Sequence, residues 1–139
     1  MILNHIIILL GFKVRIMSNK KSAVCSGCNQ HSIIVKLKQL VRIIGVPIHI
    51  IGYTYIVNAV ECMLNSDKVM FLNDIYDIIA LKNNTSIICV EVAIRNAIKR
   101  AVKSKTDMFQ TMFSFCNMQP SNSVFLNTLK EAILTENME

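Results

Sequence analysis

The sequence predicts an all-α domain, and three features of the chain lead to that prediction. Hydrophobic residues make up 53% of the 139 residues, whereas glycine and proline are rare, with four and two copies. From residue 32 onward, apolar side chains recur three and four positions apart, which is the spacing of one face of a helix. Turn signals separate these periodic stretches at residues 45–47, at residues 83–86 and at Pro120. Helices joined by short turns therefore fit the sequence better than strands.

The first 31 residues are expected to form a leader to a domain at residues 32–139. Residues 2–12, ILNHIIILLGF, are apolar, but a membrane span needs about 20 such residues and a secretory signal needs a cationic start. Residues 13–30 are polar and basic without periodicity, which predicts a flexible segment. Because Met17 begins MSNKKSAV, an ordinary N-terminus, residues 1–16 are expected to be either an over-extended gene start or a disordered leader.

Three helices are expected in the first part of the domain. The first begins at Ser32 and stops near Ile44, because Gly45 and Pro47 end the helical pattern. The second runs from about residue 49 to 65, and His49 at its start is expected to cap the helix or enter the core. The third runs from about residue 70 to 83. The side chains that should face inward from the first and third helices are Ile33, Ile34, Leu37, Leu40, Val41, Leu72, Ile75, Ile79 and Ala80.

A fourth, amphipathic helix follows the turn NNTS, in which Thr85 or Ser86 supplies the N-cap. On a wheel of 100° per residue, the stretch CVEVAIRNAIKRAVKSK at 89–105 divides into two faces. The face predicted to be buried consists of Val90, Ala93, Ile94, Ala97, Ile98 and Ala101. The face predicted to be presented contains Cys89, Glu91, Val92, Arg95, Asn96, Lys99, Arg100 and Lys103.

The third and fourth helices fit a helix-turn-helix. Ala80 is small where two helices must cross closely, Asn84 lies four residues later in the turn, and the β-branched Val90 follows six residues beyond. The alternative is a pair of packed helices with a basic solvated surface. After this pair the sequence predicts a short apolar piece at 108–116 and a last helix behind Pro120, with Ser121 as its cap and Phe125, Leu126, Leu129, Ala132 and Ile133 as its buried face.

The distribution of charge points to the same helix. Residues 95–106 carry five basic residues and no acidic residue, while 45–94 and 107–139 each carry more acidic than basic residues. A basic block between acidic stretches is typical of an element that faces phosphate, although a charge run is also ordinary on a solvated helix. The chain as a whole has a formal charge of +6.

Three stretches, IGVPIHIIGYTYI (44–56), NNTSIICVEVAIRNAI (83–98) and QPSNSVFL (119–126), resemble in content, order and spacing the C-terminal effector domain of the stage zero sporulation protein A family. The resemblance runs from about Ser32 to the C-terminus. It implies a domain of about six helices that reads a short DNA box through the second helix of its helix-turn-helix, often as tandem copies.

The resemblance carries over site residues by position. Glu91 and Arg95 match residues of the family's recognition helix that face bases or phosphates. Cys89 and Val92 stand where the family typically has arginine, and Asn96 and Lys99 stand where it has histidine and glutamate. Because arginine bound to guanine is the commonest specific contact in the major groove, these departures put the family's usual box in doubt. Lys99 favours contact with phosphate.

Other chemistry has little support in the sequence. In the family a receiver domain precedes the effector, but no aspartate or glutamate occurs before Glu61, so a phosphoacceptor pocket is not expected there. Cys25, Cys28 and His31 have the spacing of half a zinc site, yet no second pair of ligands follows, and no cofactor is expected. No nucleophile with a base, no paired catalytic carboxylates and no phosphate loop occur, which argues against an enzyme.

Two functions follow from the sequence. The first is a cytoplasmic, sequence-specific transcription regulator that acts without a phosphorylatable receiver and binds double-stranded DNA in the major groove, with an RNA polymerase sigma factor and a tandem second copy as candidate partners. The second is an interaction module that pairs with or competes against a full-length regulator without reading bases. The candidate DNA-binding residues are Thr85, Ser86, Cys89, Glu91, Val92, Arg95, Asn96, Lys99, Arg100 and Lys103.

Overall fold

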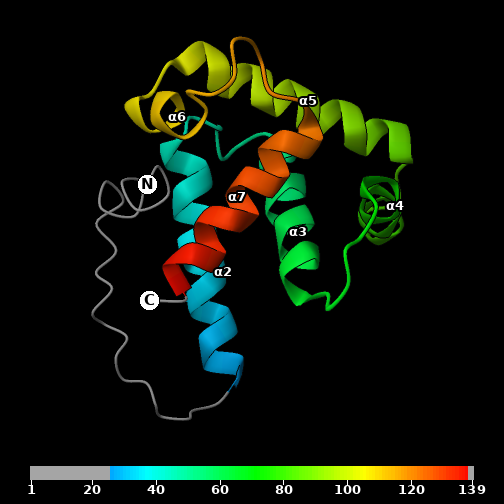
Figure 1. Ribbon diagram of the computed structural model, residues 1–139. Helices are drawn as coiled ribbons and strands as arrows, with labels where there is room; N and C mark the ends of the chain where they lie inside the picture. The colour runs from blue at the N-terminus through cyan, green and yellow to red at the C-terminus, as the bar shows by residue number, and fades with distance from the viewer. Residues whose placement is uncertain (1–25, 138–139) are drawn as a thin grey trace.

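The computed structural model describes residues 26–137, and these form six helices without a strand, as Figure 1 shows. The helices are α2 (Ser26–Ile43), α3 (Ile51–Asn65), α4 (Leu72–Lys82), α5 (Ile87–Ser104), α6 (Asp107–Met112) and α7 (Asn122–Asn137). The predicted all-α class and the helical bundle are confirmed. No helix of the described residues is both long enough and apolar enough to cross a membrane.

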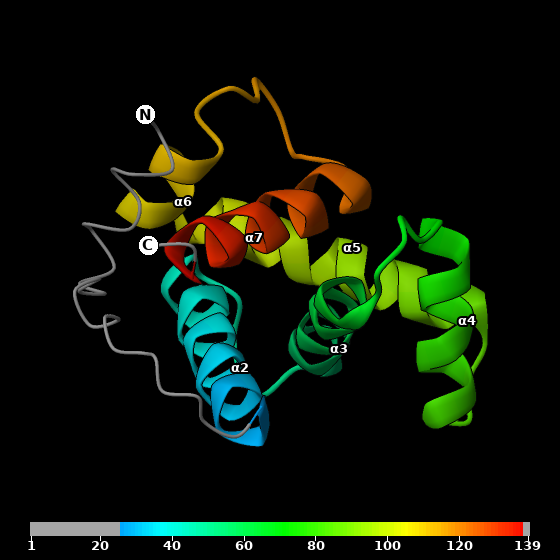
Figure 2. The same cartoon turned by 60° about the horizontal axis from the view of Figure 1, so that its bottom comes forward.

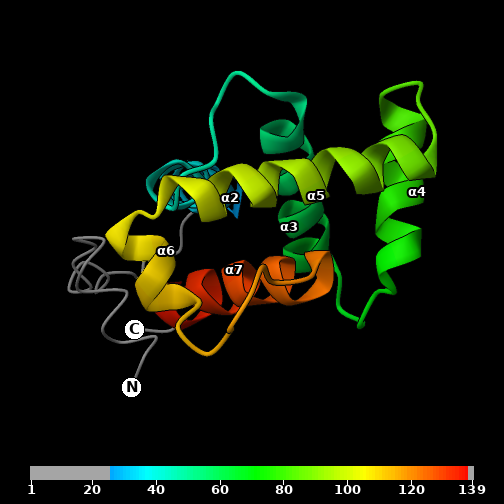
Figure 3. The same cartoon turned by 90° about the horizontal axis from the view of Figure 1, so that it is seen from above.

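Helix α3 is the centre of the bundle, because α2, α4, α5 and α7 all pack against it. Helix α5 runs across one side of the molecule, with α4 at one end and α6 at the other, as the view in Figure 3 shows. Figure 2 shows α2, α3 and α7 on the inner side of α5. The long helix α5 is thus supported along one side only, which leaves its other side to solvent.

The core is apolar and has side chains from every helix. Its fully buried members include Leu40 of α2, Ile56 of α3, Ile94 of α5 and Phe125 of α7. The ring of Phe113, just after α6, stacks on that of Phe125 with 5.3 Å between the ring centroids, which fixes the α6 region to α7. Every inward-facing residue predicted for the last helix is buried.

Helix α2 ends as the sequence predicts. Gly45 has a φ of +106°, and the backbone N–H of Val46 donates to the carbonyl of Val41 at 3.3 Å. This left-handed glycine with its long return bond is the Schellman arrangement, which only glycine adopts without strain. An ion pair of 2.7 Å between Lys36 Nζ and the buried Glu136 carboxylate then ties α2 to α7.

Two local predictions, the start of the first helix and the role of His49, are wrong, and a third segment was predicted only as apolar. Helix α2 begins at Ser26, six residues before the predicted Ser32, because its first turns are polar on all sides and give no periodic signal. His49 is exposed and caps nothing, since α3 begins at Ile51 and its N-cap residue Ile50 makes no side-chain bond. The short apolar piece is helical only at Asp107–Met112, where Thr106 caps it by accepting from the Phe109 N–H at 3.1 Å. Of the leader predicted at residues 1–31, residues 1–25 lie outside the described residues and residues 26–31 belong to α2.

Candidate nucleic-acid interface

The turn between α4 and α5 has the geometry of a helix-turn-helix. The backbone N–H of Thr85 donates to the carbonyl of Ala80 at 3.0 Å, and Asn84 has a left-handed φ of 54°. Asparagine tolerates this conformation better than most residues. Ala80 and Val90 are buried against each other's helices, with exposed fractions of 4% and 0%. The pairing that the three spaced residues predicted is therefore present.

Ser86 fixes the start of α5. Its backbone is extended, and its side-chain oxygen accepts a hydrogen bond from the Cys89 N–H at 3.2 Å. A serine in this place satisfies one of the amide groups that a helix start leaves unpaired. The prediction of a cap at Thr85 or Ser86 is thus confirmed for Ser86, while Thr85 lies half-buried just before it.

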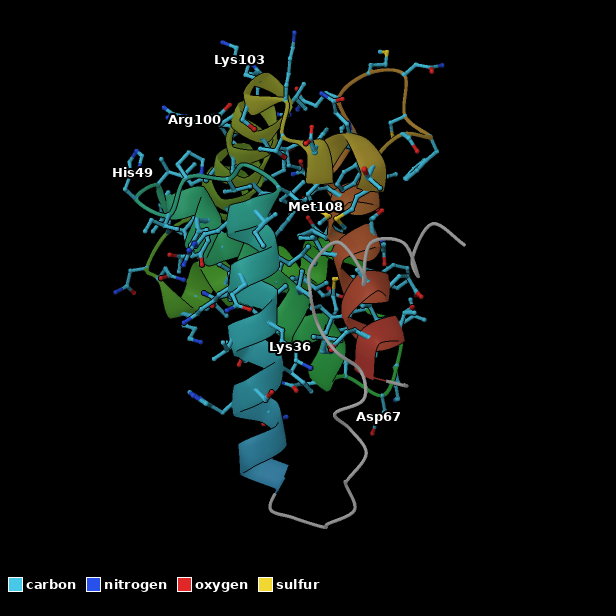
Figure 4. All side chains as sticks on the ribbon, turned by 90° about the vertical axis from the view of Figure 1, so that its left-hand side faces the viewer. Lys36, His49, Asp67, Arg100, Lys103 and Met108 are labelled. Atoms are coloured by element: carbon cyan, nitrogen blue, oxygen red, sulfur yellow. The ribbon has the colours of Figure 1, made fainter. Side chains whose placement is uncertain are left out.

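The structure confirms the two faces of α5. Val90, Ile94, Ala97, Ile98 and Ala101 are buried, and Ala93 is half-buried against the core. The candidate residues gather on the other side: Cys89, Arg95, Asn96, Lys99, Arg100 and Lys103 are exposed, whereas Glu91 and Val92 are half-buried at the margins. Figure 4 shows that Arg100 and Lys103 project from the same side of the molecule as His49. The exposed face of α5 has four cations, and none of them lies in the helix before Arg95.

The first half of α5 borders an apolar groove that the sequence does not predict. The groove has a volume of about 450 Å³ and lies between the start of α3 and the outer side of α5. Ile51 and Ile88 stand at its edges with exposed fractions of 54% and 73%. Its full lining is Ile50, Ile51, Gly52, Ile88, Cys89, Val92, Ala93, Asn96 and Arg100. Cys89 and Val92, which stand where the resembled family typically has arginine, therefore line this groove.

Residues 37–133 match the family model described as "Sporulation initiation factor Spo0A C terminal". The chain belongs to this family. The matched region extends from the middle of α2 into α7 and includes the complete helix-turn-helix. The Spo0A C-terminal family consists of DNA-binding domains of sporulation regulators, so the resemblance found in the sequence is confirmed.

Within this Spo0A C-terminal domain, one ion pair lies on α5 itself. The Arg95 guanidinium contacts the Glu91 carboxylate at 3.0 Å, one helical turn away, with half of the Arg95 side chain exposed. Asn122 of α7 holds the backbone at this pair. Its side-chain amide donates to the backbone carbonyl of Glu91 at 3.1 Å and to the Tyr76 hydroxyl at 2.9 Å. Burial raises the pKa of Tyr76, so its phenol stays protonated at neutral pH.

Asn122 is a positioning residue that sequence reasoning missed. It is 8% exposed, it opens α7 behind the cap Ser121, and its two bonds join α7 to both helices of the helix-turn-helix. A buried side-chain amide with two partners at long sequence separation gives no periodic signal. The only sign in the sequence was its position directly after the predicted cap Ser121, in the stretch QPSNSVFL.

Cys89 is a second titratable group on this surface with a shifted pKa. Hydrogen bonds from the hydroxyl groups of Ser86 and Thr85 lower the pKa of its exposed thiol below the usual value. A thiolate at this place would put a negative charge on a face that is otherwise cationic. Of the half zinc site noted in the sequence, Cys25 lies outside the described residues. Within the described residues no cluster of three or more His, Cys, Asp or Glu residues occurs.

Proposed function

We propose that this chain is a sequence-specific transcription regulator of the sporulation type that inserts α5 into the major groove of double-stranded DNA. The observation that carries the proposal is the exposed face of α5, the second helix of the helix-turn-helix, where Arg95, Lys99, Arg100 and Lys103 gather. In this motif the second helix lies in the groove with its first residues against the base edges. Clustered cations on one face supply the attraction to phosphates.

The two halves of the helix have different roles in this proposal. The first half, with Cys89 and Val92, approaches the base edges, where these small apolar side chains touch thymine methyls but cannot donate to guanine as arginine does. Asn96 can read adenine through two hydrogen bonds. The second half, with Arg100 and Lys103, contacts phosphates and sets the register. An A·T-rich variant of the family's box is therefore the expected target.

The proposal includes binding without a phosphorylation step. A phosphoacceptor site needs an aspartate, and residues 1–60 of this chain have neither aspartate nor glutamate. In this proposal, activity follows the amount of protein in the cytoplasm. Tandem copies on repeated boxes and an RNA polymerase sigma factor are the partners that this role calls for.

A second function is favoured by one specific observation. The first half of α5, where the helix should read bases, has no cation before Arg95 and instead borders the apolar groove with Ile51 and Ile88 at its edges. An exposed apolar groove is typical of a protein-binding surface. On this alternative the chain pairs with or competes against a full-length regulator and does not read bases.

Fluorescence anisotropy separates the two functions. Labelled duplexes with the family's box, an A·T-rich variant and a random sequence are titrated with the full chain over a series of salt concentrations. The regulator predicts tighter binding to one of the first two duplexes than to random DNA, with affinity that falls steeply as salt rises. Equal binding to all three duplexes contradicts sequence reading, and no binding at low salt favours the interaction module.

A further inference from the structure

The outer side of α4 carries an exposed apolar surface that no helix within residues 26–137 covers. Figure 3 shows α4 at the far end of the bundle from α6, with its outer side toward solvent. Phe71, Ile78 and Leu81 are 78%, 44% and 74% exposed, and Val69 in the preceding turn is 92% exposed. Residues 71, 78 and 81 lie seven and three positions apart, so they share one face of the helix. We call these four residues the α4 apolar surface. Large exposed apolar side chains that gather in this way mark an interaction site.

Acidic residues lie among these apolar side chains. Asp74 and Asp77 are exposed and lie within one turn of Ile78 and Leu81 on the outer side of α4. Asp67 is exposed in the turn before the helix, and Lys82 lies at its last residue. The surface therefore suits a partner that combines apolar side chains with positive charge.

One segment of this chain has that combination. Residues 2–12, ILNHIIILLGF, are apolar except for three positions, and the following stretch to residue 21 carries Lys13, Arg15, Lys20 and Lys21. Neither part contains an aspartate or glutamate. We propose that residues 2–12 cover the α4 apolar surface of the same chain, with the basic residues at 13–21 lying against Asp74 and Asp77.

The connection is long enough for this contact. The Gln30 side chain in α2 donates to that of Asn65, the last residue of α3, at 2.9 Å. From Asn65 the chain reaches Phe71 in six residues, which span at most about 20 Å. Ser26, one helical turn before Gln30, therefore lies within roughly 35 Å of Phe71 in the α4 apolar surface. The 13 residues from 13 to 25 span up to about 45 Å when extended, so residues 2–12 reach α4 without strain.

Photo-crosslinking in the full chain tests the contact. The photoreactive residue p-benzoylphenylalanine replaces Leu81, which is exposed and so tolerates the change, and a control carries it at Asn127 on the exposed side of α7. After illumination, mass spectrometry identifies the attached peptide, and an equal mixture of ¹⁵N-labelled and unlabelled protein separates bonds within one chain from bonds between two. Intact mass first establishes that the native chain includes residues 2–12.

The proposal predicts crosslinks from position 81 to residues 2–12 within one chain and none from position 127. In a background of Asp74→Lys with Asp77→Lys the yield falls several-fold, since the basic residues at 13–21 then meet like charge. Crosslinks between chains alone would identify the occupant as a second copy and overturn the proposal. Absence of crosslinks to residues 2–12, or a native chain that begins after residue 12, also overturns it.

Discussion

Replacing Gly52 by alanine tests how α5 is supported, because α3 and α5 approach closely at this glycine. A Cβ atom added at Gly52 would lie 2.5 Å from the Ala93 carbonyl oxygen and 2.7 Å from the Ala97 Cβ. Atoms in favourable contact are roughly 3.5 Å apart, so α5 has to move outward by about 1 Å. The nearest obstructing atom is the Ala93 backbone oxygen, which cannot change rotamer to make room as a flexible side chain can.

The expected cost follows from two opposed effects. Overpacking a close contact destabilises a protein by about 1–3 kcal/mol. Alanine is the better helix former and returns about 0.5–1 kcal/mol. The net loss is then up to about 2.5 kcal/mol and about 1.3 kcal/mol at the middle of both ranges, which for a domain of this size lowers the melting temperature by roughly 4–8 °C. Because α5 shifts as a unit, DNA affinity should fall as well.

Thermal unfolding followed by far-UV circular dichroism measures this effect. The matched control is Thr54→Ala, which adds no atoms and changes an exposed residue of the same helix. The control should change the melting temperature by no more than a degree or two. If Gly52→Ala melts at the wild-type temperature or above, α3 and α5 do not meet at Gly52 and the groove beside it has another shape.

Three further predictions concern the residues around the interface. Asn122→Ala removes both hydrogen bonds of the buried amide and leaves the Tyr76 hydroxyl unpaired, so urea denaturation should show a loss of about 1–3 kcal/mol. DNA affinity should fall as pH rises through the lowered pKa of Cys89, because the thiolate repels phosphate. Anisotropy measured from neutral to alkaline pH should show this fall for the wild type and not for Cys89→Ser. Restoring the family's arginines with Cys89→Arg and Val92→Arg should raise affinity for the family's box at least about fivefold more than for random DNA, and an equal gain on both would mean that the added charge acts through phosphate alone.

The parts of the fold that the sequence predicts well are those set by local patterns. The cap at Ser86, the buried side from Val90 to Ala101 and the stop at Gly45 each depend on residues within one or two helical turns. The wheel for α5 also predicts which candidate residues are presented, since a helix packed on one side exposes the other.

The rest depends on contacts between distant residues. The groove exists because Gly52 lets α3 approach α5, and this brings Ile51 close to Cys89 across the helix crossing. Asn122 contacts Tyr76, which is 46 residues away in the chain. The pair of Lys36 and Glu136 spans 100 residues. No periodicity in a single sequence encodes such pairings, so they needed the three-dimensional structure.

The most direct test of the central claim, that the exposed face of α5 binds DNA, is the salt dependence of binding after two cations are removed from that face. Each phosphate contact contributes about 0.9 to the slope of log affinity against log salt. Arg100→Ala with Lys103→Ala should therefore reduce the slope by about 2 and weaken binding to every sequence alike. The control Lys38→Ala with Lys130→Ala removes the same charge from α2 and α7 and should leave the slope unchanged. A slope that stays at the wild-type value in the first variant would contradict the claim and remove this face of α5 from the DNA interface.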